Sequence, residues 1–215
     1  MRVILTTIFY AALIFPLAAC QAETEEPAYE AGTHYEVLPQ PVPTTVPGKV
    51  EVVEVFWYGC SHCYTFESLA KDWKENLPEH AEFVQMPAIW SSVMELHAKA
   101  YYTAKALKVL DKVHMPIFEA MNLKKQKLSS EKEIAELFVA NGVAAEKFSK
   151  VFNSWGVGQQ MKLNMSRQKG YRTQGTPELV VNGKYRISAR QTGSQANMLK
   201  VADYLIAKES QAATP

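Results

Sequence analysis

The feature of this sequence that most constrains its fold is a pair of cysteines placed directly after an apolar run. The run from Val50 to Tyr58 is rich in β-branched and aromatic residues, as is typical of a buried central strand. Gly59 permits a tight exit from that strand, and Cys-Ser-His-Cys follows at residues 60–63. Behind the motif, apolar residues recur at helical spacing as far as Pro78. The pattern predicts a strand, a short turn and a helix that begins at the cysteines.

The positions of the two cysteines in this unit predict different chemical roles. Cys60 falls near the N-cap, where the helix dipole and the free backbone N–H groups stabilise a thiolate. Cys63 lies about one turn further on and faces back toward the strand. We therefore expect Cys60 to be the exposed, attacking sulfur and Cys63 to be the shielded sulfur that resolves a mixed disulfide. His62 adds a second source of stabilisation, since an imidazolium or its N–H near the sulfur opposes protonation.

Two other interpretations of the cysteine motif are a zinc site and a purely structural disulfide. Zinc needs four ligands, or three and a water, and the only other cysteine is Cys20. A disulfide between Cys60 and Cys63 closes too short a loop to stabilise a fold by much. Thiol–disulfide exchange therefore explains the pair best, with the cysteine pair itself as the redox group and no metal or other cofactor. The remaining histidines, which show no ligand spacing with the motif, are His34, His80, His97 and His114.

Length and charge narrow the range of functions. A chain of 215 residues is long enough for one well-packed domain or for a domain with a large insertion. The 23 basic and 22 acidic residues give a formal net charge of +1. This balance gives no indication of a nucleic-acid partner.

The first 19 residues resemble an export signal, with Arg2 followed by an apolar stretch from Val3 to Leu17. The stretch ends in Leu-Ala-Ala-Cys at residues 17–20, which resembles the lipobox of bacterial lipoproteins, where the cysteine is lipidated and becomes the new N-terminus. Ordinary signal-peptidase cleavage nearby is the alternative. Residues 20–33 then form an acidic, flexible spacer. We expect a periplasmic protein, tethered to the membrane through Cys20, in a compartment where disulfides persist.

The remaining pattern predicts an α/β (α+β) chain with a helical block inside it. Short strands are expected at 35–38 and at 81–86, with Pro87 closing the second, and helices are expected from about 92 to 155 with a capping box at 129–133. A longer helix is expected from 159 to Lys169, stopped by Gly170. Asn-Gly at 182–183 between apolar runs predicts a hairpin, and a final amphipathic helix follows around 196–206. This order predicts a thioredoxin-like domain made of 34–90 and 159–210, interrupted by an inserted helical domain at 91–158.

Three of these features together resemble the DsbA family of periplasmic thiol:disulfide oxidoreductases. They are the segment 56–64, the helical insertion and the Gly-Thr-Pro at 175–177 before the hairpin, and the similarity spans about 33–209. The resemblance implies that Cys60 is the nucleophile and Cys63 its resolving partner. It also implies that Pro177 is a cis-proline facing the disulfide and that the backbone of Thr176 pairs with a substrate chain.

The resemblance assigns a further role to an acidic residue on the predicted central strand. Glu54 matches the buried acid of the family that assists proton transfer from Cys63, and the alternative is a surface glutamate on an alternating strand. Glu67 is a weaker candidate for such a role and is expected to be a solvated helix residue. Two residues depart from the family pattern. Ser61 stands where proline is usual, and Thr176 stands where valine is common and where isomerase and thioredoxin relatives have threonine.

What the family implies for function is donation of the Cys60–Cys63 disulfide to reduced exported proteins. A DsbB-like, quinone-linked membrane oxidase would then reoxidise the dithiol, and the chain would work as a monomer without nucleic acid. A reductase or isomerase of the same fold is an alternative within the same chemistry. A module that binds clients or a metal through the two cysteines is an alternative of another class.

The lipobox generates a testable prediction about the mature N-terminus. We expect the mature protein to begin at Cys20 and to fractionate with membranes, because two or more acyl chains anchor stably where one is marginal. Intact-mass measurement of the purified protein reads the modification directly, and Cys20→Ser should release the protein from the membrane fraction with the Cys60–Cys63 chemistry intact. An unmodified N-terminus downstream of Cys20 would contradict lipidation.

Overall fold

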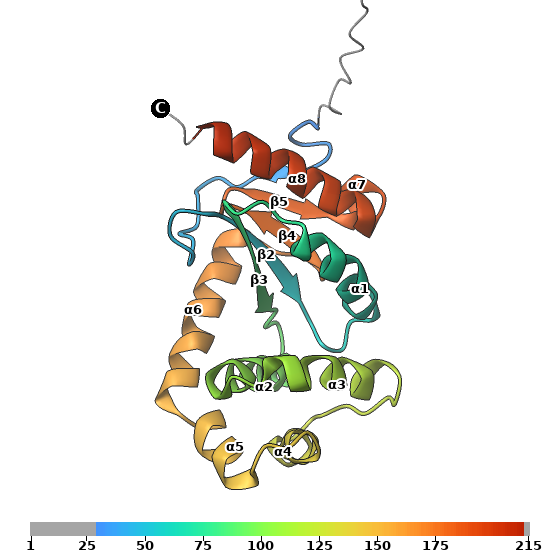
Figure 1. Ribbon diagram of the computed structural model, residues 1–215, viewed down its shortest axis with the longest axis vertical. Coiled ribbons are helices and arrows are strands. Elements are labelled where there is room, and N and C mark those ends of the chain that lie inside the picture. Colours follow the sequence, from blue (N-terminus) through green and yellow to red (C-terminus); the bar gives the residue numbers. More distant parts are fainter. Residues whose placement is uncertain (1–28, 213–215) are drawn as a thin grey trace, which may run out of the picture.

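The centre of the molecule is a mixed β-sheet with strand order β1-β5-β4-β2-β3 (Figure 1). The computed structural model describes residues 29–212. Strands β2 and β3 are parallel, and the other neighbouring pairs are antiparallel. The strands are β1 (Glu36–Val37), β2 (Val50–Phe56), β3 (Ala81–Pro87), β4 (Glu178–Val181) and β5 (Tyr185–Ser188).

Helices cover both faces of this sheet. Helices α1 and α8 pack on one face, where Phe66 and Met198 meet Val52 and Leu179 in a common core. Tyr171, at the end of α6, packs on the opposite face. The helices are α1 (Ser61–Glu75), α2 (Ser92–Leu107), α3 (Leu110–Asn122), α4 (Glu131–Ala140), α5 (Ala145–Phe152), α6 (Trp155–Tyr171), α7 (Ala189–Thr192) and α8 (Gln195–Ala212).

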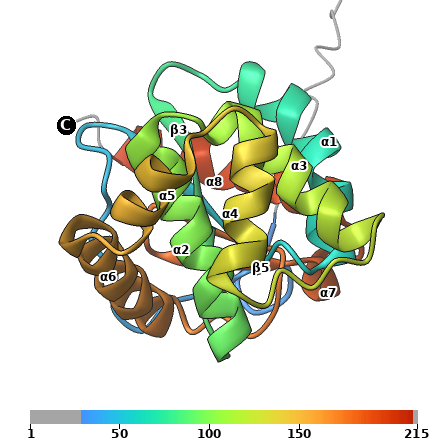
Figure 2. The ribbon, with the colours of Figure 1, turned by 90° about the horizontal axis from the view of Figure 1, so that it is seen from below.

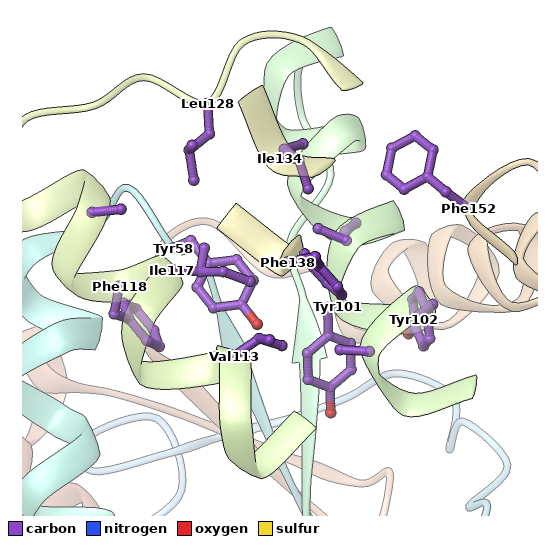
Figure 3. Close-up of a cluster of buried hydrophobic side chains, with 14 of the residues drawn as sticks. Tyr58, Tyr101, Tyr102, Val113, Ile117, Phe118, Leu128, Ile134, Phe138 and Phe152 are labelled. Carbon is purple, nitrogen blue, oxygen red and sulfur yellow. The ribbon is translucent and has the colours of Figure 1, made fainter. Parts of the chain in front are cut away.

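Helices α2 to α5 form a separate helical layer beyond the end of strands β2 and β3 (Figures 1 and 2). Their core contains Ile117, Phe118 and Phe138, all fully or almost fully buried (Figure 3). The same core also takes in Tyr58 and Cys63 from the sheet layer. The helical layer therefore packs directly against the cysteine motif, and the redox pair sits where the two layers meet.

This architecture confirms the predicted thioredoxin-like fold with helices inserted after its second parallel strand. The expected capping box is present, with the side chains of Ser130 and Glu133 each accepting a hydrogen bond from the other residue's backbone N–H. The order of elements differs from the prediction only by the one-turn helix α7, which was not expected.

The prediction for α6 is wrong at both ends. The helix begins at Trp155, because the Ser154 hydroxyl caps it by accepting from the N–H of Val157, and it continues past Gly170. Gly170 lies inside the helix, where Val42 packs against it. A Cβ at this position would lie 2.5 Å from a Val42 methyl group, which explains why a glycine occurs here. The predicted domain boundary at residue 159 therefore falls within one continuous helix.

The expectations for the N-terminus fall mostly outside the described residues, which begin at 29. The predicted signal peptide, Cys20 and most of the spacer are among them. The end of the spacer is docked against the domain, since the Tyr29 ring makes an edge contact with Tyr204 on α8 at 5.5 Å. Within residues 29–212, no helix is both long enough and apolar enough to cross a bilayer.

The hairpin between β4 and β5 generates a stability prediction. Gly183 has a φ of 63°, and its carbonyl accepts a hydrogen bond from the N–H of Val42 at 2.8 Å. A Cβ on Gly183 would overlap the Val42 backbone, whereas Gly142, with a φ of 85°, has open space around it. Both Gly→Ala changes cost about 1–2 kcal/mol through the left-handed backbone. We expect Gly183→Ala to cost clearly more than the control Gly142→Ala in urea unfolding, and equal losses would contradict the close packing of Val42.

Candidate active site

The cysteine motif is held at the end of β2 by a tight turn. The backbone N–H of Cys60 donates to the carbonyl of Trp57 at 3.0 Å. The Trp57 indole lies against Gly59 so closely that a Cβ there would overlap it, which explains the glycine in this turn. Cys60 then forms the N-cap of α1, in an extended backbone conformation. The first turn of the helix therefore directs its free N–H groups toward the Cys60 sulfur.

The two thiols occupy very different environments. Cys60 is partly exposed, whereas Cys63 is fully buried. The pKa of Cys60 is lowered to about 5, chiefly by a hydrogen bond from the Cys63 thiol and further by the Thr176 side chain and the backbone of Cys63 and His62; its partial burial opposes these effects. Burial is the main cause that raises the pKa of Cys63 well above its ordinary value. At neutral pH the pair therefore holds one thiolate, on Cys60, and one proton, on Cys63.

A distant loop completes the site from the other side. The peptide bond between Thr176 and Pro177 is cis, as the family resemblance implies. The carbonyl of Thr176 lies 3.3 Å from the Sγ of Cys60 and accepts its hydrogen bond when Cys60 is a thiol. An open groove of about 710 Å³ runs along this loop, lined among others by His62, Gln191 and Gln195. The fold therefore brings the Cys60 sulfur within hydrogen-bond distance of a loop that lines this groove.

A buried arginine holds this loop in place. Arg186 on β5 donates to the backbone carbonyl of Arg172 and pairs with Glu36 at 2.5 Å. Its Nε also lies 3.9 Å from the carboxylate of Glu178, which in turn accepts from the N–H of Gln174 at 3.3 Å. The segment from 172 to 178, which contains the cis-proline, is thus fixed at both ends.

His62 contributes to the site through its main chain. The imidazole is exposed and makes no hydrogen bond with any of residues 29–212. The backbone of His62 helps to lower the pKa of Cys60, and its carbonyl accepts from the side chain of Gln195 at 2.7 Å. The expected effect of the imidazole on the thiolate therefore stays a prediction.

Glu54 is a fully buried carboxyl group on β2, so the alternative of a surface glutamate is wrong. Its Oε2 accepts from the Nε2 of Gln85 at 2.9 Å, and its Oε1 has no partner in the described part of the chain. Burial raises the pKa of Glu54 well above its ordinary value, and the charges of Glu67 and Cys60 raise it further. The charge of Glu54 in turn raises the pKa of Cys63. Glu54 can therefore hold a proton close to the buried thiol.

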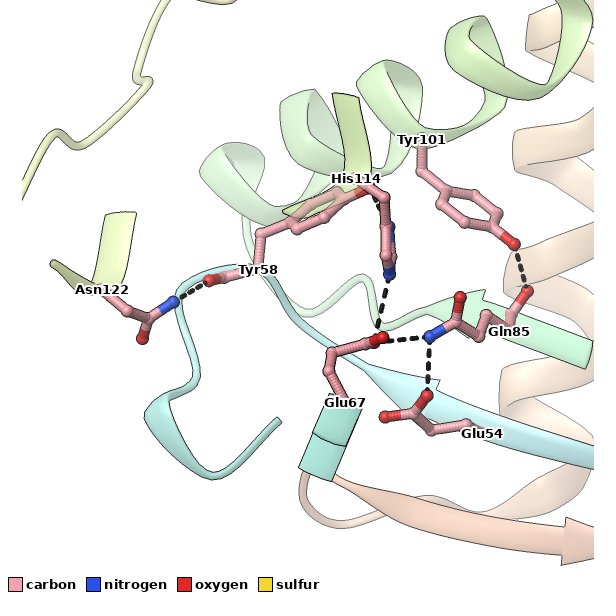
Figure 4. A network of polar contacts seen from close by, with 7 residues as sticks. All are labelled: Glu54, Tyr58, Glu67, Gln85, Tyr101, His114 and Asn122. Carbon is pink, nitrogen blue, oxygen red and sulfur yellow. Dashed lines mark hydrogen bonds and ion pairs between the residues drawn. The ribbon is translucent and has the colours of Figure 1, made fainter. Parts of the chain in front are cut away.

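Glu67 is also not the solvated helix residue that the sequence predicted. Its carboxylate accepts from the Nε2 of Gln85 at 2.7 Å and faces the Nε2 of His114 at 3.1 Å (Figure 4). The sequence contained an indication that Glu67 points toward the site, because Glu67 lies four residues after Cys63 and so on the same face of the helix. Gln85 and His114 had no such signal. Gln85 reaches Glu54 through the register of β2 and β3, and His114 arrives on the inserted helix α3.

Comparison with known proteins decides the family. The model of the DSBA-like thioredoxin domain matches residues 70–201, more than half of the chain, beginning just after the cysteine motif. The thiol:disulfide interchange protein DsbA of Pseudomonas aeruginosa is 40% identical over 212 residues, which cover 99% of this chain and 98% of that protein. The chain belongs to the DsbA family.

Further relatives agree with this assignment. The DsbA of Azotobacter vinelandii is 39% identical over 98% of this chain and 99% of its own length. Among solved structures, P. aeruginosa DsbA superposes with a TM-score of 0.83 at 41% identity, covering 87% of this chain and 97% of that one. DsbA from Xylella fastidiosa gives 0.79 at 30% identity, covering 86% and 99%. As a member of the DsbA family, the protein is a thiol:disulfide oxidoreductase. No group of three or more His, Cys, Asp or Glu side chains that could hold a metal occurs between residues 29 and 212.

The threonine before the cis-proline generates a prediction for this DsbA-family site. Thr176→Val keeps the side-chain size but removes the hydroxyl group that stabilises the thiolate, so the pKa of Cys60 should rise above about 5. Cys63→Ala should raise it more, because the Cys63 thiol is the largest stabilising contact. Thiolate absorbance in the ultraviolet, taken as a difference from Cys60→Ser, measures both.

Thr103→Val is the matched control for this titration. Thr103 is fully buried in α2, and its hydroxyl has no partner within the described residues, so the change should leave the Cys60 titration where it is. An unchanged titration in Thr176→Val would show that the Thr176 hydroxyl plays no part in stabilising the thiolate.

Proposed function

We propose that this protein is a periplasmic protein-disulfide oxidase, which donates the Cys60–Cys63 disulfide to exported proteins as they fold. The observation that carries the proposal is the difference between the two thiols. A Cys60 pKa of about 5 means that the reduced enzyme is stabilised as a thiolate at neutral pH. Stabilising the reduced form makes the disulfide a stronger oxidant, and a tenfold change in the proton affinity of Cys60 corresponds to about 30 mV.

The first step of the reaction is attack by a substrate thiolate on the Sγ of Cys60. The bond between Cys60 and Cys63 breaks, a mixed disulfide forms on Cys60, and Cys63 leaves as a thiolate. Because Cys63 is fully buried, its thiolate is unfavourable and takes up a proton. We assign Glu54 as the donor of that proton, since it is fully buried, interacts electrostatically with Cys63 and favours its own protonated form.

The second step releases the oxidised substrate. A second substrate thiolate attacks the substrate sulfur of the mixed disulfide, and Cys60 departs as a stabilised thiolate. Two electrons pass from the substrate dithiol to the enzyme. We assign the groove beside Thr176 and Pro177 to the substrate backbone, with the Thr176 carbonyl, no longer bonded to a Cys60 thiol in the disulfide form, as its acceptor. The imidazole of His62, exposed at the same groove, would stabilise the departing thiolate.

Turnover requires an electron acceptor for the reduced enzyme. We propose a DsbB-like, quinone-linked membrane protein in that role and a monomeric enzyme held near the membrane by a lipidated Cys20. The export signal and the lipobox in the sequence support this location. A tether would keep the enzyme at the surface where both its clients emerge and its oxidant lies.

Oxidation of a reduced, unfolded protein with several cysteines tests the proposal. The oxidised enzyme should form disulfides in it stoichiometrically, and equilibration with glutathione should show a dithiol more oxidising than the glutathione pool. Cys63→Ala should accumulate mixed disulfides on Cys60, because the resolving thiol is absent, whereas Cys60→Ala should accumulate none.

The alternatives give different results in the same measurements. A strongly reducing equilibrium with glutathione would indicate a reductase, and efficient reshuffling of a scrambled protein without net oxidation would indicate an isomerase. Stoichiometric metal uptake with little turnover would indicate a binding module. Equal trapping by Cys60→Ala and Cys63→Ala would overturn the assignment of the two roles.

A further inference from the structure

His114 is a nearly buried histidine for which the reaction described above has no role. It lies on α3, in the helical layer, and its ring packs against Phe56 and Phe118. Its Nδ1 lies 2.8 Å from the hydroxyl of Tyr58, and its Nε2 lies 3.1 Å from the carboxylate of Glu67 (Figure 4). Both ring nitrogens therefore have polar partners, and one partner is an anion.

The partners of His114 allow it to gain or lose a proton without losing a hydrogen bond. The Nε2–H donates to Glu67 in either charge state. The Tyr58 hydroxyl can donate to a bare Nδ1 or accept from a protonated one, because a hydroxyl group can do both. Protonation therefore reverses the direction of the hydrogen bond between Tyr58 and His114.

The second buried histidine of the helical layer is arranged in the opposite way. The Nδ1 of His97 accepts from the Trp57 indole N–H at 3.0 Å, and an indole N–H can only donate. Its Nε2 faces the carbonyls of Lys127 and Leu128, which can only accept. These contacts hold His97 in its neutral form with the proton on Nε2, and burial lowers its pKa. The hydrogen bonds of His114 are compatible with both charge states, whereas those of the other buried histidine in this layer are compatible with the neutral state alone.

The charge on His114 reaches Glu54 through two side chains. Gln85 uses the two hydrogens of its Nε2 to bridge Glu54 and Glu67, at 2.9 and 2.7 Å. The negative charge of Glu67 therefore acts on Glu54 across a single amide group, and it raises the pKa of Glu54. A protonated His114 beside Glu67 offsets that charge, and a neutral His114 leaves it uncompensated.

We propose that His114 is a positioning residue for thiol–disulfide exchange, which acts through Glu67 and Gln85 to set how firmly Glu54 holds its proton. The inference rests on the proposed function in one respect, namely that Glu54 protonates Cys63. In that step the Cys63 thiolate gains a proton, and the Glu54 carboxyl group becomes a carboxylate. A protonated His114 stabilises the new carboxylate and so favours the transfer. Protonation of His114 should therefore assist the departure of Cys63.

The surroundings of His114 connect it to solvent. An open groove of about 720 Å³ between α1 and α3 is lined by His114 and Glu67, so protons can reach the pair. The other titratable or charged groups near it are Tyr64, Lys71, Lys74 and Glu75 on α1, Asp111 on α3, Tyr101 on α2 and Tyr58 after β2. Lys74 favours the carboxylate of Glu54, in the same direction as a protonated His114. All variants keep these groups, so at one salt concentration their contributions to the pKa of Glu54 cancel when variants are compared.

Infrared spectroscopy of the protonated Glu54 carboxyl group, assigned with Glu54→Gln, tests the coupling in the dithiol enzyme. His114→Gln is never charged, and His114→Lys is charged throughout. We expect the proton affinity of Glu54 to be at least about threefold lower in His114→Lys than in His114→Gln. The unmodified protein should resemble His114→Lys at low pH, where the imidazole is charged, and His114→Gln at high pH, where it is neutral. His80→Gln, which removes an exposed histidine before β3, is the control and should match the unmodified protein.

The exchange reaction provides a second measurement. The rate at which a small thiol opens the disulfide, corrected for its thiolate fraction, should show an inflection with pH that both His114 variants lose. Glu67→Gln should lower the proton affinity of Glu54 and reduce the difference between the two His114 variants, because Glu67 is the group that places the side chain at position 114 against the Gln85 bridge. If a His114 variant does not fold, a weaker inflection in Glu67→Gln alone still tests the route.

Two results would overturn the inference. One is an identical Glu54 titration in His114→Gln and His114→Lys, and the other is an inflection that keeps its full amplitude in Glu67→Gln. The infrared titration needs no substrate, so it separates this inference from the proposed function. A protein that fails to oxidise reduced substrates but shows the Glu54 shift would refute the oxidase and leave the coupling in place.

Discussion

Cys63 lies fully buried in a core to which both the end of β2 and the inserted helices contribute, and the chemistry of the site depends on that position. A thiolate is unfavourable there, whereas Cys60, three residues earlier, has the helix N-terminus and Thr176 to stabilise its charge. Without the inserted layer, the core that buries Cys63 would lose most of its members. The insertion is therefore part of the redox site even though it carries neither cysteine.

The sequence predicted the parts of the fold and site that are fixed by neighbours along the chain. The β2–turn–α1 unit, the capping box at Ser130 and the Asn-Gly hairpin each follow from a few adjacent residues. The polar network could not be predicted in this way. Gln85 meets Glu54 because of the pairing of two strands, and His114 comes from a helix whose placement depends on the whole insertion. The end of α6 was missed for the same reason, because Val42, far away in sequence, makes Gly170 a packing residue.

Hydrogen-bond chemistry distinguishes groups that fold the protein from groups that can respond to their surroundings. A buried side chain whose partners can each only donate or only accept has a single allowed protonation state, as His97 shows. One hydroxyl partner is enough to permit a second state, as with Tyr58 beside His114. Burial therefore does not by itself identify a structural residue. The nature of each partner must be known as well, and that information exists only in three dimensions.

Helix α6 links the two layers of the molecule in one uninterrupted stretch. Val157 and Met161, in its first half, pack into the helical layer, and Tyr171, at its end, packs on the sheet. An α-helix turns by about 100° and rises about 1.5 Å with each residue. Insertion or deletion of a single residue in its middle would therefore change the rotation of one layer against the other and disturb the core that Tyr58 and Cys63 share with the inserted helices. The number of residues in α6 therefore fixes the relative orientation of the two layers. Any exchange of the helical layer, natural or engineered, must keep that number unchanged.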